Sequence, residues 1–146
     1  MSVDENKALM RRWYGMEDFK GVPKDEMEST LRNTAAEIFD SEWIAHSPQG
    51  DMSYEDFIQY NAVFLYSFPD FTCTIEDQIA EGDKVVTRLT MRGTHLGPYR
   101  GMPATGKKVE VAGVSIGRFA RGKAIEGWLI SDSLTLMQQL GLIPGQ

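Results

Sequence analysis

The sequence predicts an α+β fold in which three N-terminal helices pack on one face of a strongly curved, mainly antiparallel sheet. Two observations carry this prediction. Apolar residues recur every three or four positions in the first half of the chain and alternate with polar residues in much of the second half. The 146 residues can form one sizeable core but not two, so we assign residues 1–146 to a single domain.

The first half of the chain has the apolar spacing of three helices. One apolar stripe runs through residues 4–16, and a second follows the break GVPKDE (21–26) and ends near residue 39. Ser53 and Asp56 resemble a capping box at the start of a third, aromatic-rich helix. The residues between the second and third helices are predicted to form a turn.

The second half of the chain changes period. Four strands are predicted, over residues 71–80, 85–92, 109–119 and 124–130, with glycine-containing turns and one long loop between them. A short helix over 133–140 closes the chain. The sheet therefore has four or more strands, and helices on one of its faces would enclose a cone with an apolar cavity.

Composition and charge exclude several classes of protein. A net charge of −6 without a basic stripe argues against binding nucleic acid. No apolar run approaches the roughly 20 residues of a membrane span. The single cysteine, Cys73, favours a reducing cytoplasm. With His46 and His95 it gives no metal-ligand spacing, and no phosphate-binding loop is present, so we expect neither a metal nor a cofactor.

Three segments of the chain resemble the SnoaL-like polyketide cyclase family, which has the nuclear-transport-factor-2-like fold. They contain the motifs GTHLG, GMPATGKK and DSLTLMQQLG and span residues 75–97, 101–128 and 132–141. The resemblance implies a cone with an apolar cavity. It also implies a small apolar ligand of the polyketide or aromatic carbonyl type, acted on without a cofactor.

The same resemblance raises a question about catalysis. Ring-closing members of the family use an aspartate of the last strand as general acid and base, with a histidine of the preceding strand nearby. The matching positions here are Leu129 and Ser115, and neither side chain titrates near neutral pH. One interpretation is a cyclase or isomerase that uses other groups. The alternative is a non-catalytic module that binds a small molecule or another protein.

Two residues are the candidates for proton transfer. Asp132 is either a cavity carboxylate with a pKa raised by desolvation or the N-cap of the closing helix. If Leu129 faces the cavity, strand alternation places Asp132 off that face, which favours the cap. His46, in the predicted turn after the second helix, is either a base at the cavity mouth or a solvated loop histidine.

The expected ligand contacts are mostly aromatic or apolar, as in most small-molecule sites. Helical spacing also explains several of them as core residues. The residues expected to bind the ligand are Trp13, Trp43, Phe64, Phe68, Met91, Ser115 and Leu129. A homodimer formed through the sheet is the partner that the resemblance implies, and Arg88 and Arg92 are predicted to lie on the exposed sheet face.

Overall fold

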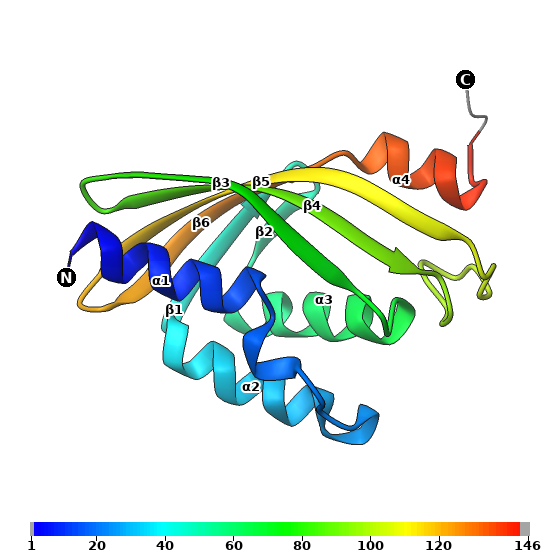
Figure 1. The fold of residues 1–146 in the computed structure, drawn as a ribbon, viewed down its shortest axis with the longest axis horizontal. Coiled ribbons are helices and arrows are strands. Elements are labelled where there is room, and N and C mark those ends of the chain that lie inside the picture. The colour runs from blue at the N-terminus through cyan, green and yellow to red at the C-terminus, as the bar shows by residue number, and fades with distance from the viewer. Residues whose placement is uncertain (1, 144–146) are drawn as a thin grey trace.

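The computed structural model describes residues 2–143, which form four α-helices, two short 3-10 helices and one mixed sheet of six strands. Figure 1 shows the helices α1, α2 and α3 on one face of the sheet, while α4 extends from the end of the last strand. The elements in chain order are α1 (Val3–Tyr14), η1 (Glu17–Phe19), η2 (Lys24–Glu26), α2 (Met27–Ile38), β1 (Phe39–Ser47), β2 (Gly50–Met52), α3 (Tyr54–Ser67), β3 (Thr72–Glu81), β4 (Lys84–Thr94), β5 (Lys108–Ala120), β6 (Lys123–Ser131) and α4 (Ser133–Leu140).

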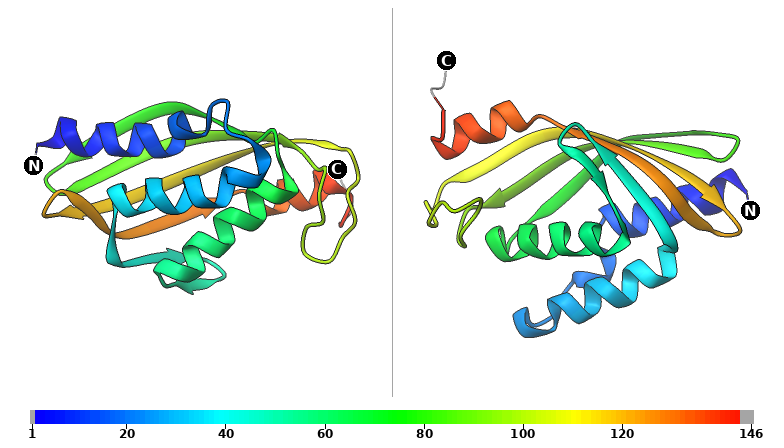
Figure 2. Two further views of the ribbon diagram at one scale, coloured as in Figure 1. Left: turned by 90° about the horizontal axis from the view of Figure 1, so that it is seen from below. Right: turned by 180° about the vertical axis from the view of Figure 1, so that it is seen from behind.

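The strands lie in the order β2-β1-β6-β5-β4-β3. The β1–β6 pair is parallel, whereas every other neighbouring pair is antiparallel. The sheet curls around the helices without closing, and its outer face is left uncovered by the described residues (Figure 2). The predicted α+β class, with helices on one face of a curved sheet, is therefore confirmed.

The predicted helix starts and strand faces agree with the structure. Ser53 and Asp56 form the expected capping box at the start of α3. On the predicted exposed face of β4, Arg88 pairs with Asp77 at 2.7 Å, and Arg92 pairs with Glu110 of β5 at 2.6 Å. Alternation along this strand therefore predicted which side chains meet solvent.

The prediction of a turn after the second helix is wrong. Residues 39–47 form strand β1, which pairs with β6 in parallel and with the three-residue strand β2. Within β1, Trp43 and Ala45 are buried, whereas Ile44 is exposed. A half-buried strand that contains Asp40, Ser41 and Glu42 has too few apolar residues to show its alternation clearly, and the parallel partner lies about 80 residues away in sequence.

Two apolar clusters hold the layers together. The first joins α1, β1 and α3 through Trp13, Phe39, Trp43 and Phe57, whose ring centroids lie 4.6–5.8 Å apart. The second lies at the other end of α3, where Phe68 packs near Tyr99 and the strand β5. Because the two clusters are separate, the space between helices and sheet is filled at both ends but not in the middle.

Gly127 of β6 lets the first cluster reach the sheet. Trp43 is only 5% exposed, and its six-membered ring lies against the Gly127 backbone, where an added Cβ would overlap the ring carbons. The indole is held on other sides by Phe39 and Phe57 and cannot easily move away. Glycine is therefore required here for close approach.

We expect Gly127→Ala to lower the free energy of unfolding by about 1–3 kcal/mol, the usual cost of overpacking a core. Urea denaturation followed by fluorescence measures the change. The matched control is Gly117→Ala in β5, where an added Cβ meets its nearest atoms at 3.4 Å from Phe119 and 3.5 Å from Met10, ordinary contacts. Equal destabilisation by both substitutions would contradict the proposed overlap with Trp43.

Candidate functional site

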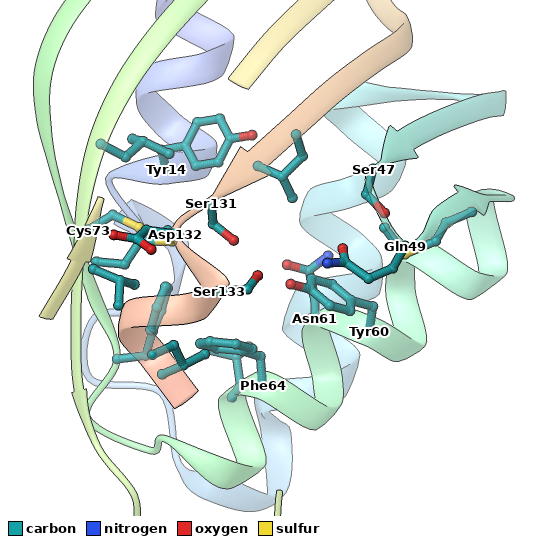
Figure 3. Close-up of a pocket in the computed structure, with 18 of the residues that line it drawn as sticks. Tyr14, Ser47, Gln49, Tyr60, Asn61, Phe64, Cys73, Ser131, Asp132 and Ser133 are labelled. Carbon is teal, nitrogen blue, oxygen red and sulfur yellow. The ribbon is translucent and has the colours of Figure 1, made fainter. Parts of the chain in front are cut away.

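A cavity of about 300 Å³ lies between the two apolar clusters, under the concave face of the sheet. Every layer contributes to its wall: α1, α2 and α3 from one side, β3 to β6 from the other, and the β1–β2 turn, the 95–107 loop and α4 around its edge. Figure 3 shows the polar side chains that point into it. The apolar lining residues are chiefly Trp13, Met16, Phe19, Leu31, Met52, Phe64, Leu65, Phe71, Leu89, Met91, Val111, Leu129 and Leu136.

Tyr14, the last residue of α1, brings a phenol to this apolar wall. Burial raises the pKa of Tyr14 above its ordinary value, and hydrogen bonding with Ser115 of β5 offsets only part of that rise. The phenol is therefore protonated at neutral pH and can donate a hydrogen bond. Its partner Ser115 is 5% exposed and lies behind the cavity wall.

A second group of polar side chains converges from α3, the end of β6, the start of α4 and the β1–β2 turn. Figure 3 shows the hydroxyls of Ser131 and Ser133 pointing toward Asn61 and Tyr60, with Gln49 of the β1–β2 turn beside them. The Asn61 amide nitrogen donates to the Phe57 carbonyl at 2.7 Å, which leaves its oxygen available as an acceptor on the cavity wall. This part of the cavity can therefore both donate and accept hydrogen bonds.

Few lining residues can change charge near neutral pH. Burial raises the pKa of the Cys73 thiol to about 12, so this group is not a thiolate under ordinary conditions. Asp51, Arg100 and Asp132 carry the charges among the described lining residues, and all three are exposed. The interior of the cavity is thus neutral, and charge is confined to its rim.

Asp132 is the N-cap of α4, as strand alternation predicted. Its Oδ1 accepts a hydrogen bond from the Thr135 backbone N–H at 3.0 Å, and its Oδ2 accepts one from the Thr135 hydroxyl at 2.6 Å. These bonds lower the pKa of Asp132, with the Thr135 hydroxyl as the largest cause. Asp132 also borders the cavity, but its carboxylate points away from Ser131 and Ser133 (Figure 3).

His46 lies on strand β1 and not in a turn, and it is absent from the described cavity wall. Its ring is on the outer face of the sheet, between Asp51 of β2 and Glu126 of β6. Neighbouring Ser47 is the β1 residue that reaches the cavity. A role for His46 as a base at the cavity mouth stays a prediction, but its ring is on the opposite side of the sheet.

The residues expected to bind a ligand divide into two groups. Trp13, Phe64, Met91 and Leu129 lie on the cavity wall. The others lie behind it: Trp43 and Phe68 are part of the two apolar clusters, and Ser115 is buried beside Tyr14. Helical and strand spacing shows which face of an element is buried, but it does not separate cavity wall from filled core.

The glycines beside Ser115 do not leave open space for a ligand. An added Cβ at Gly113 would lie 2.7 Å from the terminal methyl of Met91, and one at Gly117 would touch Phe119 and Met10. Side chains of the protein therefore occupy the room above both glycines. This packing explains why Met91 reaches the cavity and Ser115 does not.

Several cavity residues carried no clear signal in the sequence. Tyr14 and Asn61 lie outside the three segments that resemble the family, and Ser133 lies inside DSLTLMQQLG without being singled out by it. Ser131 is different, because strand alternation places it on the same face as Leu129. Asn61 gave a weaker hint, as a polar residue within the aromatic-rich run YNAVFLYS of α3. A polar residue at a buried helical position points either to an internal hydrogen bond or to a ligand.

The described chain shows no grouping of three or more His, Cys, Asp or Glu side chains that could hold a metal ion. None of the helices between residues 2 and 143 is both long and apolar enough to cross a membrane.

Comparisons with known proteins agree with this architecture. Residues 25–140 match the family model described as SnoaL-like polyketide cyclase. AclR of Streptomyces galilaeus is 25% identical, over 99% of this chain and 86% of that one, with a TM-score of 0.82. IdmH of Streptomyces antibioticus is 26% identical, over 93% and 98%, with a TM-score of 0.74. A polyketide cyclase-type protein of Bacillus cereus ATCC 10987 is 30% identical, over 95% and 82%, with a TM-score of 0.70. No curated protein matches the chain.

We expect Asp132→Ala to lower the Tm at pH 7, because α4 loses its cap, and Asp132→Asn to lower it less, because asparagine also caps helices. The folded-state pKa of Asp132 is below its ordinary value of 3.8. Its stabilising effect is therefore present above that value and is lost as the pH falls through the folded-state pKa. Calorimetry from pH 7 down to acid should show the difference between wild type and Asp132→Ala shrinking. A difference that stays constant would contradict this assignment.

Proposed function

This chain belongs to the SnoaL-like polyketide cyclase family, and we propose that it binds a small, flat, largely apolar molecule that carries a carbonyl or hydroxyl group. The observation that carries this proposal is the cavity of about 300 Å³, with an aromatic and aliphatic wall and a few converging polar groups. Such a wall favours an apolar body, and a few hydrogen-bonding groups fix its orientation. A polyketide-like or aromatic carbonyl compound has both features.

Two polar groups support the choice of a carbonyl or hydroxyl compound. Tyr14 stays protonated and offers a donor that suits a carbonyl oxygen, while the oxygen of Asn61 suits a hydroxyl group of the ligand. Both lie on a largely apolar wall, where a polar ligand group without a hydrogen-bond partner would make the free energy of binding less favourable. The neutral interior disfavours a charged ligand for the same reason.

We propose ligand binding, and not the proton transfer of ring-closing family members, as the first candidate function. The resemblance to the family matches Leu129 and Ser115 with the two positions that ring-closing members use for proton transfer, and neither side chain titrates near neutral pH. Leu129 contributes apolar surface to the cavity, and Ser115 supports Tyr14. A non-catalytic binding module fits this composition directly.

Catalysis of the cyclase or isomerase type without a cofactor is the second candidate. It is favoured by the presence on one cavity of a phenol donor, Tyr14, and an ionised carboxylate, Asp132. The ketone 1-tetralone tests it, because abstraction of its α-protons exchanges them for deuterium in heavy water, which NMR records. Exchange that is lost in Asp132→Asn, with binding retained, supports an enzyme. Exchange at the background rate in a protein that binds the ketone supports the binding module.

Tyr14→Phe should weaken binding of 1-tetralone by roughly two- to tenfold, the effect of one hydrogen bond, and leave binding of tetralin unchanged. The two compounds differ only in the carbonyl group, and calorimetry measures both affinities. Tyr66→Phe is the matched control, because Tyr66 is 57% exposed on α3 and is not part of the described cavity wall. A folded protein that binds neither compound would overturn the proposed function.

We propose a homodimer formed through the outer sheet face, in a cytoplasm whose reducing conditions suit the single thiol of Cys73. Apolar side chains on this face are exposed, with Ile130 at 62% and Ile79 at 66%. Light scattering at micromolar concentration should give twice the monomer mass, and Ile130→Glu should shift it toward monomer. Leu134→Glu, at an equally exposed position on α4, is the control. A monomeric wild type would contradict the proposal.

A further inference from the structure

A row of charged side chains, called the charged row below, crosses the outer face of the sheet from its edge strand inward. His46 Nδ1 lies 2.8 Å from Asp51, and His46 Nε2 lies 2.7 Å from Glu126. Glu126 in turn accepts a hydrogen bond from Arg118 at 2.8 Å. The four residues stand on β2, β1, β6 and β5, which are adjacent strands in that order.

Part of the charged row is shielded from water. The side chains of His46 and Glu126 are each 27% exposed, and the Trp128 ring centroid lies 5.4 Å from that of His46. Partly shielded charged hydrogen bonds are stronger than fully exposed ones. Glu126, paired on both sides, has its pKa lowered, first by His46 and then by Arg118.

The outer end of the charged row, at Asp51, holds the β1–β2 hairpin, which forms one side of the cavity mouth. Strand β2 has three residues, lies at the edge of the sheet and pairs with β1 alone within the described residues. Residues 47–52, which include the turn and β2, all line the cavity. An edge strand this short has few backbone hydrogen bonds, so a side-chain link contributes substantially to its position.

The geometry requires a doubly protonated imidazole. Ionised carboxylates only accept hydrogen bonds, so His46 must donate from both ring nitrogens to bond Asp51 and Glu126 together. A neutral imidazole has one N–H, and it would set a lone pair against the other carboxylate. The two carboxylates raise the pKa of His46 above its ordinary value of 6.5, with Asp51 as the larger cause.

We propose that His46 is a proton-dependent clasp for the cavity mouth. The charged ring ties Asp51 of the hairpin to Glu126 of β6, and loss of one proton releases one of the two links. The charged groups that face the ring are Asp51 from β2 and Glu126 from β6, and Arg118 from β5 acts through Glu126. The hairpin is thus held at lower pH and opens more readily as the pH rises through the titration of His46.

The link rests on side chains of the outer face and does not require a ligand; only its consequence for ligand entry rests on the proposed function. Because the folded-state pKa is raised, the stabilising effect is complete below about 6.5 and is lost as the pH rises through the folded-state value. Stabilisation by His46 is lost as the pH rises, whereas stabilisation by Asp132 is lost as the pH falls, so pH alone distinguishes the two groups.

Two measurements on the whole chain test the clasp. The sequence has two histidines, so comparing proton NMR spectra of the wild type and His46→Gln identifies the imidazole resonance of His46, whose titration is then followed. Amide hydrogen exchange, corrected for the intrinsic pH dependence, gives the protection of residues 44–52. We expect protection to fall roughly two- to fivefold as the pH rises through the His46 midpoint, the effect of one partly exposed link. Amides of β4 and β5 should not change.

Variants separate the clasp from a general effect of pH. His46→Gln should make hairpin protection independent of pH, because glutamine does not titrate. Glu126→Gln should lower the midpoint of His46 while the ring still bonds Asp51. A midpoint at or below 6.5 in the wild type would overturn the proposal. Hairpin protection that does not follow the midpoint, or that follows pH equally in His46→Gln, would also overturn it.

Ligand entry is measured with 1-aminoanthracene, an apolar fluorescent probe. Its association rate by stopped flow should rise across the His46 titration in the wild type and stay constant in His46→Gln. A rate that is independent of pH while the hairpin loosens would refute control of entry. If the probe does not bind at any pH, the proposed function fails, and hydrogen exchange still decides whether the clasp exists.

Discussion

The six-membered ring of Trp43 lies against the bare backbone of Gly127, and this contact fixes how the sheet wraps around the helices. Trp43 comes from β1 and Gly127 from β6, the two strands that pair in parallel. Phe39 and Phe57 hold the indole from the other sides and tie α3 to the same place. With any larger residue at position 127, the strand would have to move away from the indole, and the first apolar cluster would loosen.

The cavity is a consequence of packing the two ends of the structure more completely than the middle. The first cluster, around Trp43, fills one end, and the second, around Phe68, fills the other. Between them the curled sheet stands off from α1 and α3, and the inward side chains of β3 to β6 do not bridge the gap. The polar groups of this gap are neutral, because burial keeps the Tyr14 phenol protonated and the Asn61 amide does not ionise.

Strand alternation separates two kinds of chemistry on β1 and β6. On the inner face, Ser47, Leu129 and Ser131 line the neutral cavity. On the outer face, His46 and Glu126 are members of the charged row. The β1–β2 hairpin joins the two faces, because Asp51 belongs both to the cavity rim and to the charged row. A change of charge outside can therefore act on the cavity mouth without placing a charge inside.

The sequence alone determined the helices, four of the six strands, the cap at Asp132 and the sheet face of Arg88, because these depend on local spacing and capping. Local spacing also placed Trp13, Phe64 and Met91 on inward faces, and the resemblance to the family placed Leu129 there. Only the tertiary structure decided that β1 is a strand, that His46 faces outward, and that Trp43, Phe68 and Ser115 lie behind the cavity wall. Those outcomes depend on a parallel partner distant in sequence and on which neighbours fill the space, and local periodicity records neither.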